Sequence, residues 1–92
     1  MFVTIRVRFE MLKFRINTVF EITNRGYVLL GEILGGNIFA GAIINIDNIE
    51  LRIQSIEPVR SVNMNEIGLM VGPIDGNVAT KIKAFIGQTI II

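Results

Sequence analysis

Regular alternation of apolar and polar side chains constrains this chain more than any other feature of its sequence. Between residues 12 and 22 the stretch LKFRINTVFEI places Phe14, Ile16, Phe20 and Ile22 on one side and mostly charged or polar residues on the other. A period of two residues is typical of a β-strand with one buried face and one wet face. The stretch therefore predicts a strand whose apolar side packs on a core.

The residues that follow predict a tight hairpin. In the segment TNRG at 23–26, Asn24 tolerates a positive φ and Gly26 adopts one without steric cost. Residues 27–34, YVLLGEIL, then have the composition of a second strand. Gly31 inside that strand marks a bulge or a close approach of another backbone. The pattern predicts two antiparallel strands joined by a short turn.

Similar signals recur along the rest of the chain. The pairs Asp47-Asn48 and Asp75-Gly76 each predict a tight turn, and residues 78–85 predict one short helical turn. The Phe side chains are expected in the core. Further strands are expected at residues 2–9, 43–46, 49–57, 66–71 and 88–92. Seven or eight short strands predict an all-β protein whose antiparallel sheet closes into a small barrel, which leaves no long edge to aggregate.

Composition limits the chemistry open to the chain. With 92 residues it is expected to be one domain, and it contains no Cys and no His. Neither a disulfide framework nor the common pairs of nucleophile and base can then be built, so we expect no enzyme, no metal and no cofactor. The net charge of +1 predicts no overall attraction to nucleic acid. The apolar share of 51% favours a surface buried against a protein partner or in a homo-oligomer.

The apolar runs of the sequence bear on the location of the protein. None reaches the roughly 20 residues that a membrane-spanning helix needs. Arg6 and Arg8 interrupt the apolar stretch that a secretory signal would require. We therefore expect a cytoplasmic protein without membrane contact.

Several segments in order resemble the second domain of translational GTPases such as elongation factor Tu. That family has the pattern V-F-x-I-x-G-R-G-x-V-x-x-G-x-V followed by G-x-I-x-x-G-D-x-I-x-I. The matching segments here are FRINTVFEITNRGYVLLGEI at 14–33, GNIFAGAIINI at 36–46, RIQSIE at 52–57, EIGLMV at 66–71 and FIGQTI at 85–90. The resemblance implies a six-stranded Greek-key barrel over residues 12–92. Residues 1–10 are then an additional N-terminal strand, or Met11 is the native start.

The resemblance also implies a function and a site. In the elongation factor this domain helps to hold the aminoacylated 3′ end of tRNA, and the matching positions here are Phe20, Ile22, Arg25 and Glu57. A non-catalytic binding module that contacts tRNA, rRNA or the ribosome is the expectation that follows. Considered without the resemblance, Arg25 is a solvated turn residue and Glu57 is an exposed strand end.

The chain departs from the family at informative positions. Asn17 and Thr18 stand where the family has acidic residues, and Glu66 stands where it has Asn. No G-x-x-x-x-G-K-[ST] motif is present, so the phosphate-binding loop of a GTPase is absent from the sequence. The alternative function is a protein-interaction or self-assembling module that has the fold without a nucleic-acid ligand.

Overall fold

Six strands and one short helix make up the part of the chain that the computed structural model describes, residues 12–58, 66–72 and 74–91. In chain order they are β1 (Lys13–Ile22), β2 (Gly26–Gly35), β3 (Ile43–Ile46), β4 (Ile49–Pro58), β5 (Glu66–Val71), α1 (Gly76–Lys83) and β6 (Thr89–Ile91). The strand predicted at residues 2–9 lies outside the described residues. All the other predicted strands are confirmed, so the described part holds six strands rather than seven or eight.

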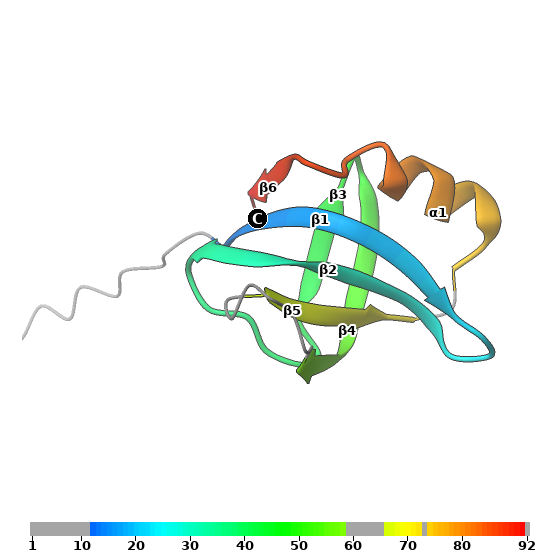
Figure 1. Cartoon of the computed structure of the whole chain (residues 1–92), viewed down its shortest axis with the longest axis horizontal. Coiled ribbons are helices and arrows are strands. Elements are labelled where there is room, and N and C mark those ends of the chain that lie inside the picture. Colours follow the sequence, from blue (N-terminus) through cyan, green and yellow to red (C-terminus); the bar gives the residue numbers. More distant parts are fainter. Residues whose placement is uncertain (1–11, 59–65, 73, 92) are drawn as a thin grey trace, which may run out of the picture.

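The strands form one antiparallel sheet that curls into a nearly closed barrel. Their order is β3-β4-β5-β2-β1-β6. After the β1–β2 hairpin the chain crosses to the far end of the sheet, and β5 returns to pair with β2, which is a Greek-key arrangement. Figure 1 shows β3 and β4 passing behind β1, β2 and β5. The predicted Greek-key barrel is confirmed, with one gap between β3 and β6, whose residues line a common hollow.

Both predicted hairpin turns are confirmed by their backbone angles. Asn24 has a φ of 64° and Gly26 a φ of 131°, and the amide of Arg25 donates to the carbonyl of Ile22 at 3.0 Å. In the β3–β4 hairpin the two central residues, Asp47 and Asn48, have φ of 51° and 64°. Positive φ at both central positions is the geometry that matches the twist of the flanking strands.

A β-bulge interrupts β1 in its middle. Ile16 lies opposite Gly31 of β2, and Thr18 lies opposite Leu30, so Asn17 is an extra residue with no residue of β2 directly opposite. An extra residue in one strand shifts the alternation of side chains by one position. Before the bulge the even-numbered residues of β1 therefore face the core, and after it the odd-numbered residues do.

The bulge overturns one expectation about β1. Phe14 and Ile16, before the bulge, are fully buried, whereas beyond it Val19 is buried and Phe20 is 41% exposed. The prediction that Phe20 and Ile22 share the buried face of Phe14 and Ile16 is wrong, because the extra residue reverses the phase.

The segment Asp75-Gly76 begins a helix instead of forming a turn. Asp75 is the N-cap of α1, and its Oδ1 accepts a hydrogen bond from the amide of Val78 at 2.8 Å. Ala79 and Ile82, three positions apart on one face of the helix, are buried against the barrel. The predicted single helical turn is thus an eight-residue helix. Within residues 12–58, 66–72 and 74–91, no helix is long and apolar enough to cross a membrane.

The core fills the inside of the barrel with side chains from every strand. Its fully buried members include Phe14, Ile16, Leu29, Ile44, Ile46, Ile53, Leu69, Val71 and Ile82. Phe85 packs against this core, so the expectation of buried Phe side chains holds for Phe14 and Phe85. It is wrong for Phe20 and for Phe39, which is 65% exposed in the loop before β3.

Candidate functional site

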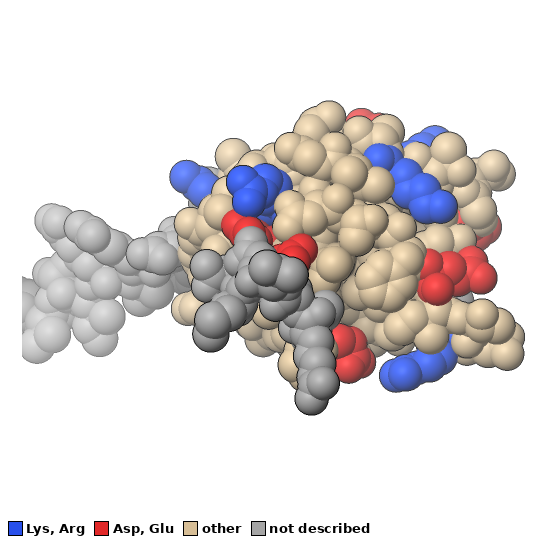
Figure 2. Space-filling view, viewed as in Figure 1, with Lys and Arg blue, Asp and Glu red and all other residues tan. Residues whose placement is uncertain are grey.

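A strip of apolar side chains runs across the outside of the sheet. Phe20 lies opposite Val28, and Val28 lies opposite Met70, and directly opposed residues of antiparallel strands point to the same side. Their chain neighbours Leu29 and Leu69 belong to the core inside the barrel, so these three side chains point outward. We call Phe20, Val28 and Met70 the outer strip. Figure 2 shows the face on which β1, β2 and β5 lie in front, where uncharged residues occupy much of the middle.

Exposure is uneven along the outer strip. Val28 and Met70 are each only 2% exposed, while Phe20 is 41% exposed. Phe20 therefore supplies most of the apolar surface that the strip offers to another molecule. Its outward position is a direct result of the bulge at Asn17, a device that re-aims side chains in many sheets.

The structure places all four site residues predicted from the resemblance on this side of the sheet. Phe20 belongs to the outer strip, and Ile22 follows it on the same side of β1. Arg25 lies in the β1–β2 turn, and its Nη2 is 4.0 Å from Oε1 of Glu57 on β4. The same Oε1 accepts a hydrogen bond from the Ser55 hydroxyl at 2.8 Å.

The ion pair of Arg25 and Glu57 is weak, but it places a negative charge next to the positive charge of Arg25 beside the outer strip. The two side chains are 64% and 38% exposed, and exposed pairs of this kind contribute about 1 kcal/mol or less to stability. Glu57 nevertheless lies within reach of the guanidinium and partly offsets its charge. Arg25 is therefore neither an isolated cation nor a fully solvated turn residue.

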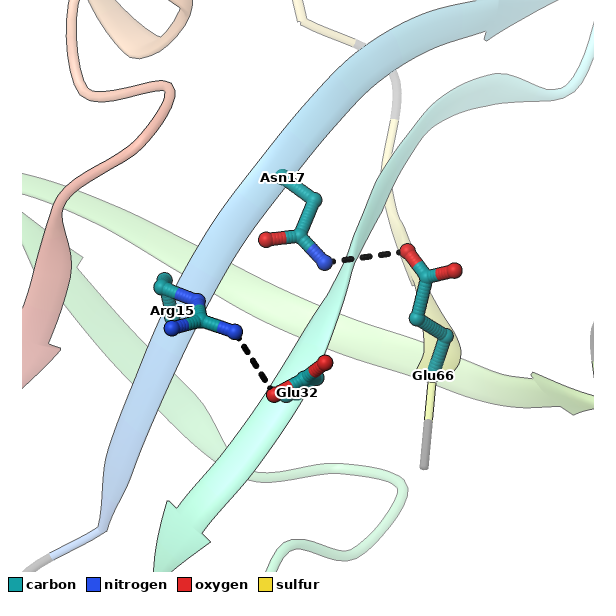
Figure 3. A network of polar contacts seen from close by, with 4 residues as sticks. All are labelled: Arg15, Asn17, Glu32 and Glu66. Atoms are coloured by element: carbon teal, nitrogen blue, oxygen red, sulfur yellow. Dashed lines mark hydrogen bonds and ion pairs between the residues drawn. The ribbon is translucent and has the colours of Figure 1, made fainter. Parts of the chain in front are cut away.

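Two further polar contacts border the outer strip, and Figure 3 shows both. Arg15 pairs with Glu32 at 2.7 Å between Nη2 and Oε2. Asn17 donates from Nδ2 to Oε2 of Glu66 at 3.0 Å. Two of the positions at which the sequence departs from the translation-factor pattern, Asn17 and Glu66, are thus bonded to each other. The sequence could not reveal this contact, because the partners are 49 positions apart.

Five charged side chains that the structure describes take part in the contacts around the outer strip. Arg15 pairs with Glu32, Arg25 lies near Glu57, and Glu66 accepts a hydrogen bond from Asn17. A groove that tracks a nucleic-acid backbone would carry an excess of Lys and Arg. Among these five described side chains, arginines are not in excess of the acids.

A hollow of about 250 Å³ lies at the β1–β2 hairpin, bordered by Ile22, Arg25, Tyr27 and Ile74 among others. Tyr27 is 8% exposed and lies directly opposite Glu21 across the hairpin. A hydrogen bond to the Glu21 carboxylate raises the pKa of the Tyr27 phenol above its ordinary value of 10.0, and burial and the charges of Glu21 and Asp75 act in the same direction. The phenol is therefore held in its neutral form as a hydrogen-bond donor.

Titration of Tyr27 tests this environment without ambiguity, because the chain has one Tyr and no Trp. The near-ultraviolet absorbance of tyrosinate should rise with a midpoint above pH 10, and Glu21→Gln should lower the midpoint more than Asp75→Asn. A raised pKa stabilises the fold at pH values below 10 and loses that contribution as the pH rises through the folded-state pKa. An unchanged midpoint in Glu21→Gln would contradict the assignment.

Val28 and Met70 are the members of the outer strip that the sequence did not single out, and both are buried. A signal was available, since YVLL and LMV are continuous apolar runs within β2 and β5. Such runs are typical of strands that are buried on both faces, whereas alternating apolar and polar residues are typical of strands that are buried on one face. Among the described residues, no three Asp or Glu side chains gather as metal ligands.

Comparison with known proteins yields no match. The chain matches no family model, no curated protein and no solved structure.

Proposed function

We propose that this chain is a non-catalytic protein-binding module and that Phe20, the exposed member of the outer strip, lies at the centre of its contact surface. The observation that carries the proposal is the bulge at Asn17, which turns Phe20 outward beside Val28 and Met70. Without the bulge, the alternation of β1 would place Phe20 in the core. A phenylalanine 41% exposed near the hairpin end of β1 leaves apolar area that a partner can cover, and aromatic residues are enriched at the centres of protein interfaces.

The charge around the outer strip favours protein over nucleic acid as the partner. Phosphate contacts from Lys and Arg supply most of the affinity of non-specific nucleic-acid binding. Here two arginines beside the outer strip, Arg15 and Arg25, already pair with Glu32 and Glu57. The high apolar share of the chain supports the same choice.

Binding of tRNA, rRNA or the ribosome is the second candidate, with the likeness to domain 2 of translational GTPases as its basis. One observation favours it, namely that Phe20, Ile22, Arg25 and Glu57 lie on the same side of the sheet. An exposed aromatic ring can also stack on a base. The two candidates differ in salt dependence and in sensitivity to ribonuclease.

The absence of catalysis and the location in the cytoplasm are parts of the same proposal. The sequence contains neither the His nor the Cys that most nucleophilic and acid–base sites use. A secreted domain of this size would commonly rely on disulfides, and the sequence has no Cys to form them.

Truncation of Phe20 tests the proposed contact surface. Phe20→Ala should weaken capture of the partner by roughly tenfold or more, because a central aromatic contact commonly contributes about 2 kcal/mol or more to binding. Capture by the tagged full chain, from lysate with and without ribonuclease and at two salt concentrations, measures the effect. Phe39→Ala is the matched control, since Phe39 is also an exposed Phe but lies in the loop before β3.

The outcomes separate the two candidates. Protein capture that survives ribonuclease and high salt, is weakened in Phe20→Ala and persists in Phe39→Ala would support the protein-binding module. RNA that is retained at low salt, lost at high salt and weakened in Arg25→Ala would favour the second candidate instead. Equal capture by the wild type and Phe20→Ala would remove the outer strip from the contact surface.

A further inference from the structure

The extra residue of β1 has two places in the β1–β2 hairpin where it can be accommodated. In the structure it is Asn17, which bulges from the middle of β1, and the turn holds the three residues 23–25 between the paired Ile22 and Gly26. If β1 paired without a bulge, the turn would hold the four residues 22–25 instead. Loops of three and of four residues are both common in hairpins.

The two pairings differ in which side of β1 meets the core beyond residue 17. In the observed pairing Val19 is 7% exposed and Phe20 is 41% exposed. Without the bulge, the even-numbered residues would continue to face the core, so Thr18 and Phe20 would point inward and Val19 outward. The pairing of this half of β1 therefore decides whether Phe20 lies on the outside of the barrel.

Contacts before the bulge are compatible with both pairings. Arg15 lies directly opposite Glu32 and bonds to it at 2.7 Å, and the amide of Ile16 donates to the carbonyl of Gln88 beside β6 at 3.0 Å. Neither contact involves the hairpin end of β1. Only the residues of β1 from 17 to 22 would change their partners.

One side-chain contact depends on the bulged residue itself. Nδ2 of Asn17 donates to Oε2 of Glu66 at 3.0 Å, and Figure 3 shows this bond lying across β2, the strand between β1 and β5. Two intervals between neighbouring strands amount to about 9.6 Å, a span that Asn and Glu side chains bridge only when they are close to level along the strands. The contact is therefore sensitive to the position of residue 17 along β1.

The pairing without a bulge would move Asn17 away from Glu66. Asn17 would then lie directly opposite Leu30, whereas Glu66 lies opposite Glu32, two residues away along β2. That offset is about 6.6 Å along the strands. In the bulge Asn17 stands short of that position, on the side toward Glu66, so the bond favours the bulged pairing.

We propose that the hydrogen bond from Asn17 to Glu66 holds the extra residue in the middle of β1 and so keeps Phe20 on the outside of the barrel. Both side chains are then positioning residues for the contact surface, whether or not they touch the partner. This consequence for binding rests on the proposed function, while the choice between the two pairings does not. A hydrogen bond to a carboxylate shifts an equilibrium of this kind by roughly tenfold or more.

Labelling of single thiols in the full chain measures the pairing without any binding partner. The sequence contains no Cys, so Val19→Cys introduces one thiol on the core side of β1 and leaves Phe20 in place. Val71→Cys is the matched control, because Val71 is also buried and lies in β5, which does not change in either pairing. The reagent is an aromatic disulfide, and the absorbance of the thiolate that it releases gives the rate.

The ratio of the labelling rate at position 19 to that at position 71 is the quantity compared among variants. Asn17→Asp should raise this ratio about tenfold or more, because the ionised side chain cannot donate and repels Glu66. Asn17→Ala removes the donor without adding a charge and should raise the ratio as well. Adding Glu66→Gln to Asn17→Asp restores a donor and an acceptor with their roles exchanged, and should reverse most of the increase.

Deletion of Asn17 is the control for the extra residue. It leaves a regular strand in which Val19 still faces the core, so the ratio should stay at its wild-type value. A raised ratio in the deletion variant would overturn the proposal.

Two further outcomes would overturn it. Equal acceleration at positions 19 and 71 in Asn17→Asp would mean that unfolding exposes both thiols and that β1 keeps its pairing. An increase that Glu66→Gln does not reverse would remove Glu66 as the holding partner. Asn17→Ala is read by the first criterion if Asn17→Asp does not fold. Partner capture by Phe20→Ala is measured separately, so the failure of one proposal is distinguishable from the failure of the other.

Discussion

Replacing Gly31 with alanine is expected to destabilise the protein by about 3 kcal/mol or more, beyond what most single substitutions do. A Cβ at this position would lie 1.9 Å from the carbonyl oxygen of Arg15 and 2.8 Å from Cζ of Phe14. The ring could shift, but the carbonyl belongs to the neighbouring strand, so β1 and β2 would have to separate. A domain of this size has a total stability of roughly 5–14 kcal/mol, so a large share of it would be lost.

Gly35→Ala provides the matched control in the same strand. The nearest atom to a Cβ there is Cδ of Lys13 at 3.8 Å, an ordinary contact with a flexible side chain. Urea unfolding followed by circular dichroism should show a change within about 0.5–1 kcal/mol for Gly35→Ala, against the large loss for Gly31→Ala. Equal losses in the two variants would show that the approach of Arg15 to Gly31 is not what requires a glycine.

The close approach at Gly31 is one of the features that the sequence did predict. A glycine inside an otherwise apolar strand indicates either a bulge or a nearby backbone, and both are present, since the bulge at Asn17 lies just across from it. The strands and the two hairpin turns were equally readable, because alternation and turn residues are local signals. Pairing order across the sheet was available only through the resemblance to translation factors.

The phase reversal in β1 could not be read from the sequence for a specific reason. Val19 and Phe20 are adjacent and both apolar, so the stretch satisfies an uninterrupted alternation through Phe20 and an interrupted one through Val19 equally well. Only the packing of β1 against β2 decides between them, and it selects Val19 for the core. The exposed position of Phe20 follows from that choice.

The helix α1 shows a second limit of local signals. Asp followed by Gly is favoured in tight turns, and Asp is also favoured at the N-cap of a helix. Here the helix is favoured because Ala79 and Ile82, three positions apart, lie on one helix face and are buried there. Local signals have the same limit at the candidate site. The resemblance pointed to Arg25 and Glu57 as two separate positions, and only the structure shows that their side chains lie 4.0 Å apart.

Phe14→Ala is expected to have the other large effect, a loss of about 3–5 kcal/mol in the free energy of unfolding. The ring is 0% exposed and lies against Gly31, which has no side chain to fill the space that the ring would leave. Chemical unfolding measures the loss, and Phe39→Ala is the control with the same change at a 65% exposed site, expected within about 0.5 kcal/mol. Similar losses in both variants would contradict the buried position of Phe14.

Combining the two sites separates the ring from the carbonyl as the reason for a glycine at position 31. Phe14→Leu shortens the side chain over Gly31 and leaves the Arg15 carbonyl in place. If the clash with the Arg15 carbonyl causes most of the destabilisation, Gly31→Ala should remain severely destabilising in the Phe14→Leu background. The coupling energy between the two substitutions should then be small compared with the stability lost in Gly31→Ala alone. Recovery of most of the lost stability in the double variant would instead make the ring the controlling neighbour, and the strands would then have room to accept a methyl group.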